Sequence, residues 1–234
     1  GLKERISSTG TFVPGAAGSV SGVPVMEAND VVINDWPVPA SYSIDDNLSP
    51  AGNAAASAIA RAAAINRVSE QTGVHATAVS TVMSGASMDP TYVNGGVSTG
   101  SVIINGYTSP TFTTVLGDAT SSRKAVIDEV NRMSYLTGVV AVDSGIDNAG
   151  IRLEAKDGRN IEVAFLPQDA STSAQFSART GLVAGVQTGT YVLEADRNTP
   201  VVVKATVGGV LARTGLPEGE YAFNRIALET AART

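Results

Sequence analysis

The side chains that most often carry out chemistry in proteins are scarce in this chain. It has one histidine, His75, and no cysteine among 234 residues. A single imidazole leaves no histidine-rich metal site, and without a thiol there is no disulfide, thiolate nucleophile or thiolate ligand. A Ser-His-Asp triad would have to use His75. The sequence therefore predicts that the protein is not an enzyme, with no catalytic residue, no cofactor and no metal site.

Cation binding by carboxylates in turns is the second chemistry to consider. The segment 143–148 (DSGIDN) offers the oxygen atoms of Asp143 and Asp147, which are ligands of the kind that calcium prefers. It lacks the spacing and the closing bidentate glutamate of an EF-hand loop. We interpret these two acids, together with Asp157 and Asp169, as solvated turn residues rather than metal ligands.

An internal repeat is the strongest pattern in the chain. Residues 66–76 (NRVSEQTGVHA) return 65 residues later as residues 131–141 (NRMSYLTGVVA), and seven of the eleven positions are identical. Such a match indicates a duplicated structural unit. His75 becomes Val140 in the second copy, so the imidazole is not required by both. The residues that define the repeat, which we interpret as structural, are Ile65, Asn66, Gly73, Val74, Val130, Asn131, Gly138 and Val139.

Each copy of the repeat is expected to hold the end of a helix and the start of a strand. Alanine-rich sequence predicts a helix over 53–71, and apolar spacing predicts a second helix over 122–136. Gly73 and Gly138 stand where each apolar pattern stops, the usual place of a left-handed residue. We expect Asn66 and Asn131 to bind loop backbone and fix each helix against a sheet. The expected buried faces are Ala58, Ala62, Ile65 and Val68 in the first helix and Ile127, Val130 and Met133 in the second.

Strands are predicted on both sides of these helices. Segments 30–44 and 101–116 each predict a pair of strands, the second with a tight Asn-Gly turn at 105–106. After the second helix, three segments predict an antiparallel meander: 139–142, 151–155 and 160–165. The first unit shows no matching hairpin, because 83–96 is typical of a long loop. Beyond residue 165 we expect short strands at 190–195 and 201–205 and no further helix.

These elements predict the α+β class, with two repeated units of antiparallel strands packed on one helix each. The chain divides into residues 1–96, residues 97–170 and a β-rich segment, 171–234, that packs on the two units. The formal net charge is −6, which argues against nucleic acid or an anionic membrane as a partner. No apolar run approaches the roughly 20 residues that span a bilayer, and the first residues lack a secretory signal.

The repeated sequence resembles a motif of a known family. Residues 60–66 (ARAAAIN) and 72–76 (TGVHA) are similar to the IN motif of bacterial flagellins and hook-associated proteins, which is named after a pair such as Ile65-Asn66. The second copy departs from the motif with Val130-Asn131. Segments 122–127, 157–161, 189–193 and 199–203 are also similar to flagellin variable regions, so the resemblance spans residues 25–210. No long heptad helices of a flagellin core are present.

This resemblance implies a structural protein, the outer and surface-exposed domains of a flagellin, which serves motility and forms the antigenic surface of the filament. Its partners would be other flagellin subunits, joined through core domains outside this sequence. It also implies an extracellular location on the bacterial flagellum, reached by export without a cleaved signal peptide. The motif occurs in filament, hook-associated and cap proteins alike, so it does not separate them.

A second hypothesis is a module of a hook-associated or cap protein that binds glycans or host receptors. Sugar sites often use exposed aromatic rings, and Trp36, the single tryptophan, is the expected contact. Tyr42, Tyr92 and Tyr107 are further candidates. An enzyme of another type is the third hypothesis, and the sequence shows no site for it.

Overall fold

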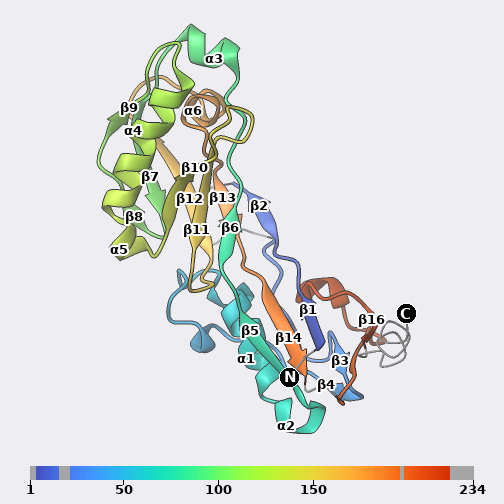
Figure 1. Ribbon diagram of the computed structural model, residues 1–234. Coiled ribbons are helices and arrows are strands. Elements are labelled where there is room, and N and C mark those ends of the chain that lie inside the picture. Colours follow the sequence, from blue (N-terminus) through green and yellow to red (C-terminus); the bar gives the residue numbers. More distant parts are fainter. Residues whose placement is uncertain (1–3, 16–21, 196–197, 222–234) are drawn as a thin grey trace, which may run out of the picture.

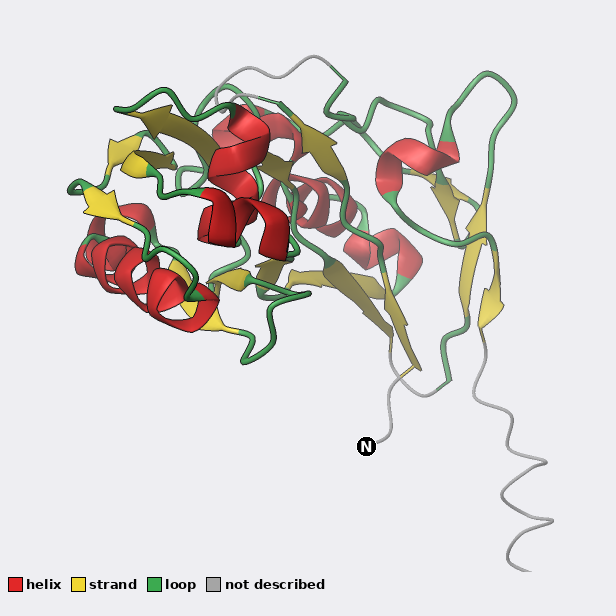
Figure 2. Ribbon diagram, turned by 90° about the horizontal axis from the view of Figure 1, so that it is seen from above, coloured by secondary structure: helices red, strands yellow, loops and turns green. Residues whose placement is uncertain are grey.

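The computed structural model describes residues 4–15, 22–195 and 198–221, and it has the predicted α+β class. Helices and strands are both spread across the molecule, as the view in Figure 2 shows. The helices are α1 (Ala58–Asn66), α2 (Ser69–Thr72), α3 (Pro90–Gly95), α4 (Ala119–Arg132), α5 (Ser134–Thr137) and α6 (Ser173–Thr180), with the 3-10 turns η1 (Ser43–Asp45), η2 (Ala54–Ala56) and η3 (Leu211–Thr214).

The strands are short and pair antiparallel in four sheets. In chain order they are β1 (Glu4–Ser7), β2 (Phe12–Pro14), β3 (Val32–Ile33), β4 (Trp36–Pro37), β5 (Val74–Ala78), β6 (Thr81–Met83), β7 (Thr99–Ile104), β8 (Tyr107–Thr108), β9 (Phe112–Thr113), β10 (Val140–Asp143), β11 (Ile151–Ala155), β12 (Ile161–Pro167), β13 (Gly185–Gln187), β14 (Tyr191–Ala195), β15 (Val201–Lys204) and β16 (Gly219–Tyr221).

Two hydrophobic cores divide the molecule into two units. Unit 1 contains α1 and the sheets β1-β14-β5 and β16-β15-β3-β4, and its core includes Ile6, Ile65 and Leu193. Unit 2 contains α4 and the sheets β10-β11-β6 and β2-β13-β12-β7-β8, and its core includes Val130 and Leu153. In Figure 1 the units lie end to end, with unit 2 at the top.

The two units share one topology. The order β16-β15-β3-β4 of unit 1 corresponds to β13-β12-β7-β8 of unit 2, and β1-β14-β5 corresponds to β6-β11-β10. Unit 2 adds β2 at one sheet edge and β9 beside β7. In the chain, most of unit 2 lies between β5 and β14, so it interrupts unit 1. The sequence repeat therefore reflects a fold that is used twice, once inside the other.

The missing hairpin of the first unit is present, which corrects the expectation that 83–96 replaces it by a loop. The counterpart of β11 and β12 is formed by β14 and β15, after the whole of unit 2. The register confirms the match, because Leu153 pairs with Ala141 and Met83, while Leu193 pairs with Ala76 and Ile6. The Leu-Glu-Ala sequence recurs at 153–155 and 193–195.

The predicted helix over 53–71 is present as three shorter pieces, η2, α1 and α2. Ser57 has an extended backbone, with ψ of 159°, and its side chain accepts a hydrogen bond from the Ala60 N–H, so it caps α1 and separates it from η2. Val68, with φ of −113°, separates α1 from α2. The second helix begins at Ala119 and breaks at Met133 in the same way. The expected faces are buried, with Val68 and Ile127 only partly so.

A further helix, α6, corrects the expectation of none beyond residue 165. It begins with a capping box in which Thr172 accepts from the Gln175 N–H and the Gln175 side chain accepts from the Thr172 N–H. Phe176 is the fully buried anchor of this helix and packs on the rings of Phe112 and Phe165. With eight residues, α6 is too short to show a clear apolar period.

The predicted C-terminal segment, 171–234, does not form a unit of its own. Its described residues contribute to both hydrophobic cores. Phe176 and Leu182 belong to the core of unit 2, whereas Tyr191, Val203 and Leu216 belong to that of unit 1. The cores therefore follow the topology rather than the boundaries at 96 and 170. Within the described residues, no helix has the length and apolar character needed to cross a membrane.

The units are connected by successive strands that run along the molecule. The pairs β1 and β2, β5 and β6, and β13 and β14 each pass from one unit to the other in Figure 1. The first and last described strands, β1 and β16, both lie in unit 1. Unit 2 therefore projects away from the unit in which the described chain starts and finishes.

Candidate functional site

The repeated residues form a structural corner in each unit. We call it the asparagine corner and define it by Asn34, Asn66, Thr72 and Gly73 in unit 1 and by Asn105, Asn131, Thr137 and Gly138 in unit 2. At each corner the end of a helix, the edge of a sheet and the turn of a hairpin meet.

Asn66 joins helix α1 to the outer edge of β5. Its Nδ2 donates to the Ala76 carbonyl at 2.9 Å, and its Oδ1 accepts from the Ala76 N–H at 2.8 Å. Asn131 makes the same two bonds to Ala141 at 3.0 and 2.7 Å. Because β5 and β10 are edge strands, the amide takes the place of a neighbouring strand. Both polar atoms of each side chain are used within the protein.

Asn34 and Asn105 hold the hairpin turns against the helix ends. Both have positive φ, 49° and 48°, as the first residue of a tight turn requires. The Asn34 Nδ2 donates to the Thr72 carbonyl at 2.7 Å, and the Asn105 Nδ2 donates to the Thr137 carbonyl at 3.0 Å. Each Oδ1 accepts a backbone N–H of the central strand at 2.8 Å, from Val202 in unit 1 and Glu162 in unit 2.

The end of each helix is fixed by a threonine and a glycine. The Thr72 hydroxyl accepts from the Val74 N–H at 3.1 Å, and the Thr137 hydroxyl accepts from the Val139 N–H at 3.0 Å. Gly73 and Gly138 both have φ of 70°, a left-handed conformation that a side chain would strain. Ile65, Val74, Val130 and Val139 are fully buried. The corner is thus complete without a ligand.

Asn34 and Asn105 were not singled out in the sequence as site residues. Their signal is the shared pattern of two apolar residues followed by Asn, at 32–34 and 103–105, ahead of each helix. The pattern is shorter than the 66–76 repeat, and the separation is 71 rather than 65. Unit 1 has six more residues than unit 2 between the hairpin and the helix, which accounts for the different separation.

His75 lies on the exposed side of β5, opposite Glu194 of β14. Its neighbours along the strand, Val74 and Ala76, point inward and are buried. No group of three or more His, Cys, Asp or Glu side chains placed to hold a metal ion occurs among the residues that the structure describes. His75 is therefore a surface residue of a strand.

The turn acids Asp143 and Asp147 are not simply solvated, which corrects the sequence interpretation. The buried guanidinium of Arg123 donates from Nε to Asp143 at 2.7 Å and from Nη1 to Asp147 at 2.5 Å. These bonds raise the pKa of Arg123 against the opposing effect of its desolvation. The carboxylates balance a buried cation and fasten the loop between β10 and β11.

Two further ion pairs lie on the surface of α4. The Arg132 Nε donates to Glu129, three residues earlier, at 2.9 Å. Asp128 accepts from Lys124, four residues earlier, at 2.7 Å. Both pairs are exposed on α4 and contribute little to stability.

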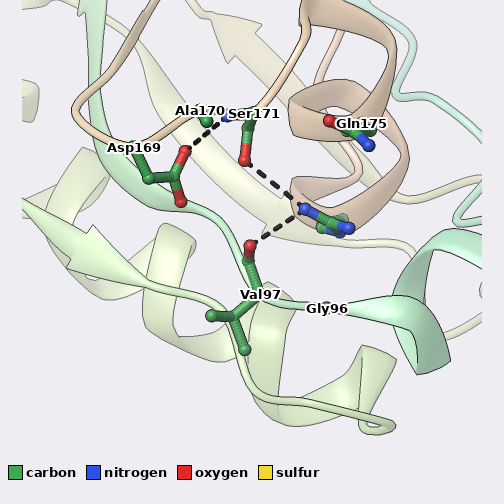
Figure 3. A pocket seen from close by; sticks show the side chains of 7 residues that line it. Gly96, Val97, Asp169, Ala170, Ser171 and Gln175 are labelled. Carbon is green, nitrogen blue, oxygen red and sulfur yellow. Dashed lines mark hydrogen bonds between the residues drawn. The ribbon is translucent and has the colours of Figure 1, made fainter.

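A pocket lies at the far end of unit 2, between α6 and the segment before β7. It has a volume of about 320 Å³ and is lined by Gly96, Val97, Asp169, Ala170, Ser171, Gln175 and Arg179 (Figure 3). Arg179 donates to the carbonyls of Tyr92 at 3.0 Å and Val97 at 2.9 Å. Asp169 accepts from the N–H groups of Thr99 at 2.7 Å and Ser171 at 2.9 Å. These bonds fasten the loops that form the wall.

One motif beside this pocket was missed in the sequence. Residues 96–100 (GVSTG) have the Gly-x-Ser-x-Gly spacing of a hydrolase nucleophile elbow. Ser98 is fully buried, its hydroxyl lies 2.8 Å from that of Ser171, and the segment enters a strand, β7, rather than a helix. The only histidine lies in the other unit. The motif therefore helps to hold the loops of the pocket wall together and is not a nucleophile elbow.

Trp36, the expected sugar contact, lies in β4 directly after the turn at Asn34, with 48% of its surface exposed. Tyr107 occupies the same position of unit 2, after the turn at Asn105, and is 45% exposed. Tyr42 lies under the Arg67 guanidinium, 5.5 Å from the ring centroid, and Arg67 also pairs with Asp45. Trp36 and Tyr107 are thus the two aromatic rings that the repeat presents in equivalent places.

Comparisons with known proteins name no family for this chain. It matches no model of a protein family. A search of curated proteins finds no significant relative.

The asparagine corner predicts a clear mutational result. Replacing Asn66 or Asn131 by alanine removes two hydrogen bonds and leaves two backbone groups at a sheet edge without their partner. Each change should lower the free energy of unfolding by about 1–3 kcal/mol, measured by urea denaturation. The exposed Asn47→Ala variant is the control and should stay within about 0.5 kcal/mol of the parent. Equal effects at all three positions would contradict the role given to the corner.

Asp169 predicts a pH dependence. Hydrogen bonds from the Ser171 side chain and from the backbone of Thr99 and Ser171 hold the pKa of Asp169 below its ordinary value. Its contribution to stability is therefore present above the unfolded-state pKa of about 3.9 and is lost as the pH falls through the lower folded-state pKa. The difference in unfolding free energy between the parent and Asp169→Asn should shrink from pH 6 to pH 3. A difference that stays constant over this range would refute the assignment.

Proposed function

We propose that this chain is the outer, surface-exposed region of a bacterial flagellin and a structural component of the flagellar filament. The observation that carries the proposal is the use made of the repeated motif. The Asn66 side chain donates to and accepts from the backbone of Ala76, and the Asn131 side chain does the same with Ala141. A motif whose polar atoms all bond within the protein has a structural role. Its resemblance to the IN motif is the reason to propose a flagellar protein.

The arrangement of the units supports a display role. Strands β1 and β16 both lie in unit 1, and unit 2 stands at the other end of the molecule (Figure 1). A module that projects from a filament needs its two chain connections at its base and its distal surface free. Unit 2 is placed as such a distal surface.

The contact between the units supports a rigid projection. Asn53 of unit 1 donates from Nδ2 to the Glu162 carboxylate of unit 2 at 2.9 Å, and its carbonyl accepts from the Asn160 side chain at 2.8 Å. The Asn160 N–H donates to the Ser49 hydroxyl at 2.8 Å. All four residues are buried. A buried polar network of this kind is specific in geometry, so it favours one orientation of the units.

In this proposal the partners are other flagellin subunits, held through core domains outside this sequence, and the location is extracellular. The net charge of −6 would give the filament an anionic surface. The activity is presentation of a surface that serves motility and antigenicity, not turnover of a substrate.

Immunogold electron microscopy tests the proposal. Antibodies raised against the purified chain should decorate flagella along their whole length on cells that encode it, and mass spectrometry of sheared filaments should find the chain as a main component. Decoration of the filament tip alone would indicate a cap protein, and decoration of the hook junction a hook-associated protein. Labelling confined to other parts of the cell would refute the proposal.

Glycan or host-receptor binding is the second candidate function. It is favoured by the two equivalent exposed rings, Trp36 and Tyr107. Stacking on a sugar would require the indole face to be free, so Trp36→Ala should abolish saturable binding on a glycan array. Tyr107→Ala, at the same position of the other unit, is the matched variant. An array without hits for the parent would remove this candidate.

A further inference from the structure

The two units provide an internal comparison of surfaces, because the same fold positions occur twice in one chain. Positions that face the core keep their character: Val74 corresponds to Val139, Ala76 to Ala141 and Leu193 to Leu153, and all six are buried. This agreement shows what the fold itself requires of β5 and β10. Any difference at the outward positions must have another cause.

The outward positions differ between the units. On the central strand, Val192 of unit 1 corresponds to the charged Arg152 of unit 2. At five other positions, on α2 and β5, on their counterparts α5 and β10, and on one edge strand, unit 1 has a polar residue where unit 2 has an apolar one. The pairs are Glu70 and Tyr135, Gln71 and Leu136, His75 and Val140, and Thr77 and Val142, and on the opposite edge strand Arg5 and Val82. We call Val82, Tyr135, Leu136, Val140 and Val142 the outer apolar surface.

The outer apolar surface is open to solvent. Tyr135 is 83% exposed, Val82 46%, Leu136 42% and Val140 39%, while Val142 is partly buried. Unit 1 has the same backbone with polar residues at all five positions, so the apolar side chains are not needed for folding. Exposed apolar groups that the fold does not require indicate a contact surface.

We propose that the outer apolar surface is where unit 2 contacts a second copy of this chain in the filament, an inference that rests on the proposed function. Copies with a net charge of −6 repel one another, and a contact through a surface without net charge adds nothing to that repulsion. The charged residues on the outer face of β11 are Arg152 and Glu154, which pair with each other at 2.6 Å. This face is therefore electrically neutral.

The size of the surface also fits a contact within an array. Five side chains, one of them partly buried, cover less than the roughly 800 Å² per partner that a stable interface buries. A pair of free chains would separate readily. In a filament the same contact is repeated at every subunit, and the core domains hold the copies at high effective concentration. The surface is thus expected to act in the filament and to leave the isolated chain monomeric.

A pair of single-cysteine variants tests the inference, because residues 1–234 contain no cysteine. Glu70→Cys and Tyr135→Cys place a thiol at equivalent exposed positions of the two units. In the purified chain both should react with a maleimide at similar rates. In intact filaments the Tyr135→Cys thiol should react at least about tenfold more slowly than in the purified chain. The Glu70→Cys thiol should react at the same rate in both. Filaments of the parent protein, without cysteine in this chain, give the background labelling.

Equal labelling of the two thiols in filaments that contain the chain would overturn the inference and leave the proposed function standing. Filaments that lack the chain would overturn both. A triple variant, Tyr135→Glu, Leu136→Gln and Val140→His, carries the residues that unit 1 has at these positions. It should keep the melting temperature of the purified chain. In filaments that also carry Val82→Cys, the triple variant should restore maleimide labelling, and continued protection of that thiol would contradict the inference.

Discussion

The interaction on which the structure depends is the pair of hydrogen bonds that one asparagine side chain makes with both backbone groups of one strand residue. Asn66 does this for Ala76, and Asn131 does it for Ala141. The bonds set the distance and direction between helix and sheet, and they cover the middle of an edge strand that another chain could otherwise pair with. The buried valine two residues before this point, Val74 in unit 1 and Val139 in unit 2, then fills the core beneath it. The second asparagine of each corner, Asn34 or Asn105, ties the hairpin to the same helix end.

Because this corner is self-contained, the fold can be used twice and can be interrupted. Unit 2 enters between β5 and β14, two strands that pair side by side in unit 1. Their ends are adjacent, so a whole unit can be inserted without disturbing the core of the first. At the connection between the units, Asn53 bonds to both Asn160 and Glu162, and all three are buried. The Asn160 Oδ1 is buried there without a partner among the described residues, which is a cost of the connection. The result is a projecting second unit with a fixed orientation, which suits the display role proposed for the chain.

Features encoded in neighbouring residues could be predicted from the sequence. The Asn105-Gly106 turn, the left-handed glycines Gly73 and Gly138 and the buried helix faces all follow from local spacing. The hairpin of unit 1 could not be found in this way, because its strands lie after an insertion of more than a hundred residues. Arg123 illustrates a second limit, since a buried cation is recognised only when Asp143 and Asp147 are seen beside it. The role of Trp36 stays a prediction, because exposure alone does not distinguish a contact residue from an ordinary surface ring.

Hydrogen exchange of two backbone amides tests the central claim most directly. The Ala76 and Ala141 N–H groups lie on edge strands and donate to the Oδ1 atoms of Asn66 and Asn131. If the asparagine corner holds each unit together, both amides should exchange only when the unit unfolds, as slowly as the amides of the central strands β14 and β11. Exchange at the rate of exposed edge-strand amides would show that the side-chain bonds open freely, and it would contradict this account of the fold.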